Sequence, residues 1–453
     1  MRHLLVTLTV ILMVGLLAAA CAAPTQPPAA QEAPAADAAE AEPTPIVAQY
    51  GEGGVELTYS HGLTGADGVT MQKMVESFVK DNPDISVTIE AMPWNIYWDK
   101  LLTSMVSGSP PDVFIIHEFA TSGFSSQGVL RDSADLYQSG GGSLPDDDFK
   151  PELLERLDWE GVRYGVPLDN LGWGTWVNRD LLEAAGFNPD EPPVDQTEFL
   201  SMVRQLTIDA NGNNAESADF DPENVVQWGI AINNPKNTFQ SVLWQFGGDV
   251  FDAEHAMLTE EPAQAAAKFL NDLIYVDHVS PPPGGFNALQ AFGAGQLAIM
   301  PGGTWNLNFM LDSGINWGAW PMLTMGLEPA TRMSSHVLHM PAGLEGEQLE
   351  AAKRLVYYLS DNGLTWAESG QVPARFSVQE NLDPVVHKAT IVFAEAFLDQ
   401  GRLEVPRPPK SEIAEAWEPE INGMWDNVTP IEEALQTANE RVQAVLDRNN
   451  IEQ

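Results

Sequence analysis

Residues 55–60 read VELTYS, and a glycine-rich turn, HGLTGADG, follows at 61–68. The sequence then predicts an amphipathic helix, a strand at 85–89 with apolar residues at alternate positions, a second helix at 98–106, and a buried strand, DVFII, at 112–116. This βαβαβ order predicts an α/β fold with a doubly wound parallel sheet. Such sheets bind ligands at the carboxyl ends of their strands.

Polar residues stand at two of these predicted strand ends. His61 directly follows the first strand, and His117 and Glu118 directly follow the third. The switch-point rule makes all three candidate ligand-binding residues. A buried histidine with satisfied hydrogen bonds is the alternative for either imidazole.

The rest of the chain continues to alternate helices and strands, and we detect no internal repeat. Strand patterns are predicted at residues 297–303, 317–321 and 337–340, and helical patterns at 179–185, 197–209, 239–246, 262–276, 286–294, 353–359 and from 413 onward.

Charge excludes several classes of partner. The 453 residues include 22 Lys+Arg and 64 Asp+Glu, a net charge of −42. A chain this acidic repels nucleic acid and anionic membrane surfaces. Removing residues 1–20 takes away one Arg, which gives 21 − 64 = −43. That charge favours a solvated monomer and mildly favours a neutral ligand.

The single cysteine, Cys21, follows a segment typical of a secretory signal, with a basic start, an apolar stretch and small residues before the break. The run at 17–21, LAAAC, resembles the lipobox of bacterial lipoproteins, in which the Cys sulfur carries a diacylglycerol. We therefore expect residues 1–20 to be a signal peptide and Cys21 to be lipidated. An ordinary signal peptide followed by a stray thiol is the alternative. Residues 21–54, rich in Ala, Pro and Glu, are predicted to be a disordered linker.

Seven stretches, in order along residues 55–450, resemble the extracellular solute-binding proteins, family 1, of ABC importers. None of the seven is a catalytic motif. They are SHGLTG at 60–65, MPW at 92–94, GSPPDV at 108–113, VPLD at 166–169, WQFGGD at 244–249, GGTW at 302–305 and GQVPAR at 370–375.

The resemblance implies a two-lobe fold of the type II periplasmic-binding-protein kind, with three interlobe crossings and the ligand in the cleft. Lobe one would be residues 55–165 plus 320–368, and lobe two 166–319 plus 369–453. The implied function is a non-enzymatic, lipid-anchored, extracytoplasmic receptor. It would capture a mono- or oligosaccharide by lobe closure and deliver it to the membrane subunits of an ABC permease.

Aromatic residues are the first candidates for the sugar site, because a sugar ring offers apolar C–H faces for stacking. Trp305 follows a glycine pair that lets the backbone approach closely. Trp94, Trp173 and Trp244 are further candidates. Packing in the core is the alternative for each of them.

Three polar residues complete the candidate site. Asp169 aligns with an acidic position that the family often uses on sugar hydroxyls, and a turn or helix cap is its alternative. Asp249 ends one of the stretches that carry the resemblance. The guanidinium of Arg375 could hold vicinal hydroxyls or an acidic group, with an interlobe salt bridge as the alternative.

No cofactor is expected, apart from one calcium option. Asp209, Asn211 and Asn213 alternate like the first ligands of a calcium loop, but Asn214 stands where glycine is expected and Phe220 where the closing Glu is expected. A polar surface loop is the alternative.

Two other functions stay open. A binder of glycerol 3-phosphate or a related polyol phosphate would need positive charge in the cleft. A secreted glycoside-active enzyme would need only two suitable carboxylates. The sequence contains no G-x-S-x-G, H-E-x-x-H or P-loop motif.

Overall fold

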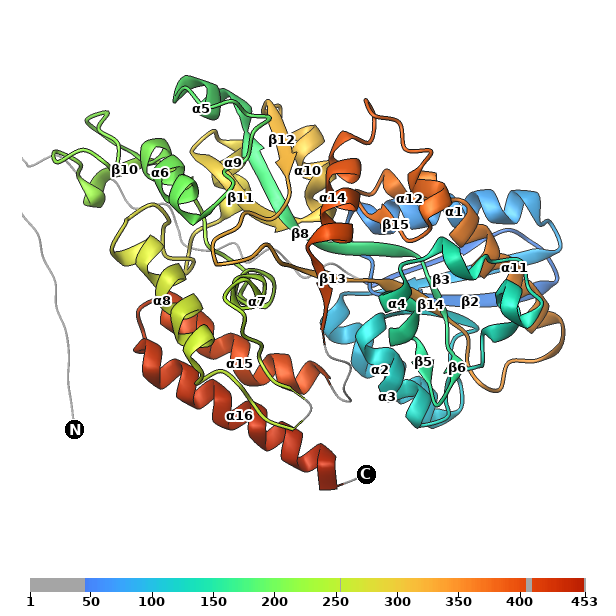
Figure 1. Cartoon of the computed structure of the whole chain (residues 1–453). Helices are drawn as coiled ribbons and strands as arrows, with labels where there is room; N and C mark the ends of the chain where they lie inside the picture. Colours follow the sequence, from blue (N-terminus) through green and yellow to red (C-terminus); the bar gives the residue numbers. More distant parts are fainter. Residues whose placement is uncertain (1–44, 253, 405–409, 452–453) are drawn as a thin grey trace, which may run out of the picture. The chain divides into compact units, whose positions relative to one another are not determined.

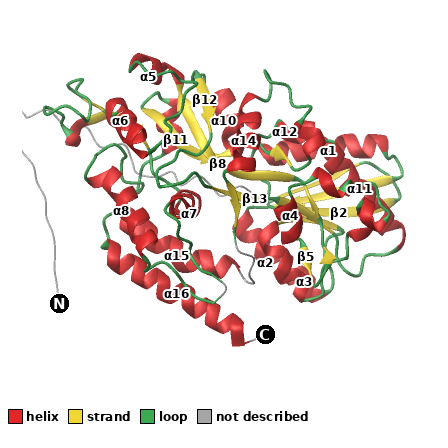
Figure 2. Ribbon diagram, in the orientation of Figure 1, coloured by secondary structure: helices red, strands yellow, loops and turns green. Residues whose placement is uncertain are grey.

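The computed structural model describes residues 45–252, 254–404 and 410–451, which form two large sheets flanked by helices (Figures 1 and 2) and one small sheet of β5 (Asp158–Trp159) and β6 (Val162–Arg163). Cys21 and residues 21–44 of the predicted linker lie outside the described residues. No helix within the described ranges combines the length and the apolar character needed to cross a membrane.

The first sheet confirms the predicted βαβαβ unit. Strand β2 pairs in parallel with both β3 and β4, and α1 and α2 form the connections. The strand order is β1 (Ile46–Tyr50), β3 (Ile85–Ala91), β2 (Val55–His61), β4 (Val113–His117), β14 (His336–His339) and β7 (Val166–Pro167). The helices of this lobe include α1 (Ala66–Asp81), α2 (Trp94–Ser107), α3 (Thr121–Ser126), α4 (Pro151–Arg156), α11 (Gly346–Asp361) and α12 (Gly363–Ala367).

Alternation along β4 explains how this sheet is covered on both faces. Val113 and Ile115 pack into a core with α1 and α11, whereas Phe114 and Ile116 pack with α2 and α3. Because side chains alternate across a strand, a continuous apolar run is what a strand buried on both faces requires.

The first strand lies earlier than predicted. Residues 46–50, assigned to the linker from the sequence, form β1, which pairs antiparallel with β3 at the edge of the sheet. Ile46 and Tyr50 pack against the core, and Val47 between them is exposed. This short alternation is sufficient for an edge strand although proline-rich sequence precedes it.

The second sheet is built around β8, whose ten residues are all buried. The strand order is β16 (Gly401–Leu403), β13 (Thr331–Ser334), β8 (Asp169–Asn178), β11 (Leu297–Gly303), β10 (Val225–Ile230) and β9 (Ile208–Asp209), and β12 (Trp317–Trp320) and β15 (Val372–Pro373) also pair with β8. The helices of this lobe include α5 (Arg179–Ala184), α6 (Gln196–Leu206), α7 (Pro235–Gln245), α8 (Glu261–Tyr275), α9 (Ala288–Gly293), α10 (Leu307–Asp312), α14 (Lys388–Asp399), α15 (Lys410–Trp425) and α16 (Ile431–Ile451). Helices α5 to α9 lie close to their predicted positions, and α15 and α16 occupy the region predicted to be helical from residue 413 onward, whereas α10 and α14 were not predicted.

The described chain passes between the two sheets at three places. The first is Leu168 between β7 and β8, the second is Ser335 between β13 and β14, and the third lies between α12 and β15. The second crossing is later than the boundary predicted at residue 320. Both β12 and β13 pair with β8, so the chain stays in the second lobe until Ser334.

Candidate functional site

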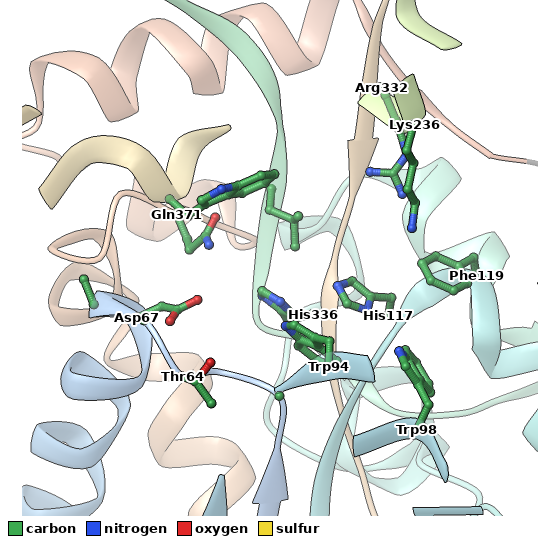
Figure 3. A pocket seen from close by; sticks show the side chains of 15 residues that line it. Thr64, Asp67, Trp94, Trp98, His117, Phe119, Lys236, Arg332, His336 and Gln371 are labelled. Atoms are coloured by element: carbon green, nitrogen blue, oxygen red, sulfur yellow. The ribbon is translucent and has the colours of Figure 1, made fainter. Parts of the chain in front are cut away.

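A cavity of about 420 Å³ lies between the two sheets (Figure 3). The first lobe contributes the turn after β2, two tryptophans of α2, the residues after β4, and one residue of β14. The second lobe and the crossings contribute the opposite wall. The lining residues are Gly62, Thr64, Gly65, Ala66, Asp67, Trp94, Trp98, His117, Phe119, Leu171, Lys236, Trp305, Arg332, His336 and Gln371.

Trp94, predicted from the sequence, lines the cavity from the first lobe and rests against the backbone of Gly62. A Cβ atom added to Gly62 would lie 2.1 Å from Cδ2 of the indole. The ring stacks with His336 at 5.6 Å between centroids and contacts His117 at 4.4 Å. Glycine is therefore needed at residue 62 to seat this ring.

Trp305, also predicted, lines the cavity from the second lobe and is seated in the same way. A Cβ atom added to Gly303 would lie 2.3 Å from Cε2 and Cζ2 of the Trp305 indole. Trp173 packs behind it, with 5.8 Å between the ring centroids. Each lobe thus presents one tryptophan positioned by a strand-end glycine.

Polar groups line one end of the cavity. Thr64 and Asp67 lie in the turn after β2, and Gln371 faces them from the third crossing (Figure 3). The hydroxyl of Thr304 donates to Oε1 of Gln371 at 2.6 Å, which fixes the amide orientation. Burial raises the pKa of Asp67 against the lowering effects of nearby His336 and of the Gly68 N–H. These groups suit hydroxyl recognition.

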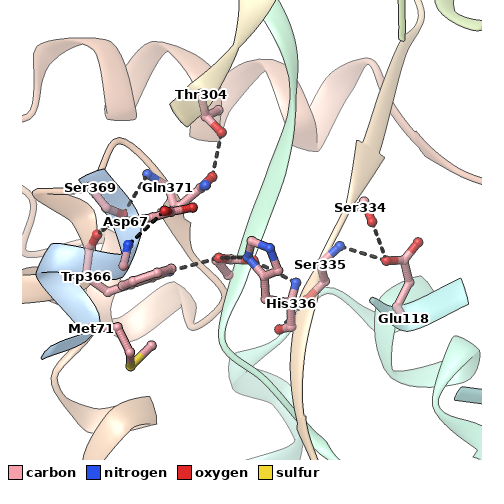
Figure 4. Close-up of polar contacts among 12 residues, drawn as sticks. Asp67, Met71, Glu118, Thr304, Ser334, Ser335, His336, Trp366, Ser369 and Gln371 are labelled. Carbon is pink, nitrogen blue, oxygen red and sulfur yellow. Dashed lines mark hydrogen bonds and ion pairs between the residues drawn. The ribbon is translucent and has the colours of Figure 1, made fainter. Parts of the chain in front are cut away.

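His336, labelled in Figure 4, lines the cavity and is held by Asp169. Its Nδ1 lies 2.8 Å from Oδ2 of Asp169, and its backbone N–H donates to Oδ1 at 2.8 Å. Trp366 Nε1 donates to the same carboxylate at 2.8 Å. Burial acts to lower the pKa of His336, but Asp169 outweighs it and the pKa is raised.

Asp169 therefore joins all three crossings and does not line the cavity. It begins β8 after the first crossing, His336 begins β14 after the second, and Trp366 in α12 precedes the third. The Asp169 side chain is fully buried, and its oxygens accept the three hydrogen bonds described above. The structure places this predicted ligand residue behind His336, where the crossings meet.

Glu118 and His61 also lie behind the cavity wall. Oε2 of Glu118 accepts from the Ser334 hydroxyl at 2.6 Å and from the Ser335 N–H at 2.8 Å, so this carboxylate holds the second crossing. His61 is fully buried, and burial together with the nearby His336 lowers its pKa to about 3. Of the three residues predicted at strand ends, His61, His117 and Glu118, only His117 lines the cavity.

Two basic residues lie at the other end of the cavity from Asp67 (Figure 3). Arg332 is buried, its Nε donates to Glu404 at 2.5 Å, and its Nη1 donates to Asn237 at 3.0 Å. Lys236, in the first turn of α7, places its ammonium 5.6 Å from the ring centroid of Phe119. The cavity thus has a hydroxylated end and a cationic end, with aromatic rings between them.

Four other predicted residues lie outside the cavity lining. Trp173 donates its indole N–H to Thr238 in the core at 3.0 Å, and Trp244 is buried in α7. Burial raises the pKa of Asp249, which accepts a bond from the Val250 N–H at 2.7 Å. Arg375 pairs with Asp148 at 2.7 Å and with Asp361, which is the salt-bridge alternative.

The proposed calcium loop is closed by its own hydrogen bonds. The carboxylate of Asp209 accepts from the N–H groups of Asn211, Asn213 and Asp221, at 2.8 to 2.9 Å. Burial opposes these bonds, but together they lower the pKa of Asp209 to about 2. The described residues contain no cluster of three His, Cys, Asp or Glu side chains placed to hold a metal ion.

Several lining residues were not predicted. Thr64 and Asp67 belong to the glycine-rich turn, and Phe119 follows His117, so the strand-end rule applied more widely would include them. Lys236 lies further from its strand, in the first turn of α7 after the loop that follows β10. Arg332 and His336 had no local signal, because pairing between distant strands brings them to the cavity.

Two α/β lobes, three crossings and a cavity lined from both lobes define a two-lobe ligand-binding protein. A family model described as bacterial extracellular solute-binding protein matches residues 73–394. The chain belongs to this family of bacterial extracellular solute-binding proteins.

Individual relatives are distant. A putative binding protein from Brucella abortus (strain 2308) is 27% identical over 158 residues, which are 34% of this chain and only 36% of that relative's length. An sn-glycerol-3-phosphate-binding periplasmic protein from Rhizobium meliloti (strain 1021) is 24% identical over 58% of this chain and 61% of its own. A maltotriose-binding protein from Pyrococcus abyssi (strain GE5 / Orsay) is 22% identical over 80% and 75%, respectively.

Solved structures confirm the two-lobe fold. An ABC substrate-binding protein from Listeria monocytogenes, solved in complex with cycloalternan, has a TM-score of 0.72 at 20% identity. The match covers 87% of this chain and 99% of that one.

Proposed function

We propose that this protein is the substrate-binding component of an ABC importer and binds a mono- or oligosaccharide between its lobes. The observation that carries the proposal is the pair of tryptophans, Trp94 and Trp305, that the two lobes present to one cavity. Indole faces suit the apolar faces of sugar rings, and Thr64, Asp67 and Gln371 supply hydrogen-bonding groups for hydroxyls. The maltotriose-binding and cycloalternan-bound relatives support this choice.

Ligand capture would proceed by closure of the lobes. A ligand that touches Trp94 and Trp305 together gains those contacts only when the lobes are close, so it shifts the population towards the closed form. The closed receptor would then deliver the sugar to the membrane subunits of a permease. In this proposal the cavity binds and releases its ligand without chemical change.

We also propose that Cys21 anchors the protein to the outer face of the bacterial cell membrane through a lipid. The sequence LAAAC at 17–21 supports this anchor. Metabolic labelling with a fatty acid tests it: the wild type should be labelled and found with membranes, and Cys21→Ser should not be labelled. Equal labelling of both proteins would contradict the anchor.

A thermal-shift screen tests the ligand. A ligand at 100 times its Kd stabilises the native state by about 2.7 kcal/mol, so the melting temperature of the purified protein should rise with at least one sugar of a broad panel. The panel should also contain glycerol 3-phosphate, because the positive charge of Lys236 at the cavity favours the polyol phosphate alternative and a relative carries that ligand in its name. A shift with glycerol 3-phosphate and with no sugar would overturn the sugar proposal.

The enzyme alternative has its own test. Incubation with oligosaccharides should release no new reducing ends. If the wild type releases reducing ends and Asp67→Asn, which changes the carboxylate that lines the cavity, does not, the protein is a glycoside-active enzyme.

A further inference from the structure

The ammonium of Lys236 is a cation at the cavity wall that has no polar partner among the described residues. It lies against the Phe119 ring, on the side of the cavity where Figure 3 shows Arg332. Within the described part of the chain, Lys236 makes neither a hydrogen bond nor an ion pair. A lysine ammonium carries three N–H donors, and leaving them unpaired in a partly buried site is costly.

The neighbouring cation, Arg332, is already neutralised. Its guanidinium donates to Glu404 and Asn237, both in the second lobe. Among the described residues that line this end of the cavity, the positive charge left for a ligand is therefore that of Lys236.

The carboxylates that act on Lys236 make no hydrogen bond or ion pair with it. Glu404 is bonded to Arg332, and Oε2 of Glu118 accepts hydrogen bonds from Ser334 and Ser335 at the second crossing, whereas the buried Oε1 of Glu118 has no hydrogen-bond partner among the described residues. Glu404, Glu418 and Glu118 act to raise the pKa of Lys236, but burial and the nearby Arg332 outweigh them and the pKa is lowered. Asp67 lies at the opposite end of the cavity (Figure 3).

The helix that carries Lys236 does not offer its own N-terminus as an anion site. Asn234 caps α7, and its side chain accepts from both the N–H and the side-chain amide of Asn237. An acceptor group on a ligand would therefore be met by the Lys236 side chain.

We infer that Lys236 selects a sugar that carries an anionic group, a carboxylate or a phosphate, with the sugar ring between Trp94 and Trp305. This inference rests on the proposed sugar-binding function and names the substrate class. An anion would receive charge-assisted hydrogen bonds from the ammonium, which are stronger than those a neutral hydroxyl accepts. The local charge at Lys236 outweighs the average field of the acidic chain, because exposed charges are screened beyond about 10 Å.

The experiment compares sugars that differ at one position. Glucose, galactose and mannose are each offered as the neutral sugar, the uronate and the 6-phosphate, and Kd is measured by calorimetry. We expect at least one acid to bind about tenfold or more tightly than its neutral counterpart, in line with hydrogen bonds to charged groups. The uronate and phosphate arms separate the two kinds of anion.

Variants assign the effect to the side chain. Lys236→Met should reduce the preference for the acid to about threefold or less, and Lys236→Arg should retain most of it. Lys80→Met is the matched control, because it removes one charge from an exposed position in the first lobe. Lys236→Gln serves in place of Lys236→Met if the latter does not melt cooperatively.

The outcomes separate the inference from the proposed function. Neutral sugars that bind as well as their acids, or an acid preference that survives Lys236→Met, would overturn the inference and leave the sugar receptor standing. Binding of glycerol 3-phosphate with no binding of any sugar would overturn both. Loss of the acid preference in Lys80→Met as well would assign the effect to net charge and overturn the role of Lys236.

Discussion

Gly62→Ala should weaken ligand binding through the Trp94 ring alone. The new Cβ would lie 2.1 Å from Cδ2 and 2.4 Å from Cε2 and Cε3 of the indole. Carbon atoms in contact settle at about 3.5 Å or more, so the ring must withdraw by about 1.4 Å. Residue 62 is outside the left-handed region, so alanine causes no backbone strain there.

The loss of binding free energy can be worked out from the stacking contact and the apolar surface that the displaced Trp94 ring no longer covers. Losing a stacking interaction costs about 1 kcal/mol. Uncovering roughly 50 Å² of apolar surface costs about another 1.2 kcal/mol at 25 cal/mol per Å². The sum of about 2 kcal/mol corresponds to a Kd roughly 30-fold higher, measured by calorimetry with the best sugar from the screen.

Two further variants test whether the ring carries the effect. Gly343→Ala is the matched control, because a Cβ atom there meets nothing within 4 Å, and it should bind as the wild type does. In a Trp94→Leu background, Gly62→Ala should cost little more, because the clashing ring is gone. Wild-type affinity for Gly62→Ala, or the same 30-fold loss in both backgrounds, would refute this reasoning.

Other variants distinguish residues that contact the ligand from residues that stabilise the fold around the cavity. Arg375→Met should leave Kd within about twofold of the wild type and lower the free energy of unfolding by about 1 kcal/mol or more, because Arg375 pairs with Asp148 outside the cavity. A large change in Kd without a change in stability would instead show that Arg375 contacts the ligand. Asp169→Asn should lower stability to urea by about 3 kcal/mol, because a buried pair with His336 is broken; a loss under 1 kcal/mol would show that the carboxylate does not hold the crossings. Burial lowers the pKa of His339 to about 3 in the folded protein, whereas in the unfolded chain it is near 6.5. Below pH 6.5 the unfolded chain therefore binds a proton that the folded protein does not, and the free energy of unfolding falls as the pH falls. Between pH 7 and 5, wild type should therefore lose about 2 kcal/mol more than His339→Phe in urea titrations, and parallel losses would contradict the shifted pKa.

Local sequence patterns predicted the parts of the molecule that depend on local interactions. Alternating apolar residues placed β2, β3 and β4, and the strand-end rule brought His117 to the cavity. The glycine pair before Trp305 predicted a ring free to face the ligand, and Trp305 lines the cavity, but the sequence did not show that the ring rests against Gly303.

Features that depend on tertiary contacts could not be read in this way. Asp169 and Glu118 stand at strand ends like true cavity residues, and only the pairing of distant segments shows that their oxygens face the crossings. Arg332 and His336 reach the cavity on strands whose neighbours lie more than 100 residues earlier in the chain. The acidic composition gave an average charge and could not reveal a cationic end of the cavity.

The carboxylate shared by the three crossings would restrict the lobe closure proposed above. Sliding one lobe along the other would break the bonds from His336 and Trp366 to Asp169 together, whereas rotation about an axis near Asp169 strains them little. Because displacement in a rotation grows with distance from the axis, atoms near His336 hardly move and those at the outer rim of the cavity move most. A longer ligand would therefore be accommodated by a smaller closing angle, with the same contacts kept at the hinge.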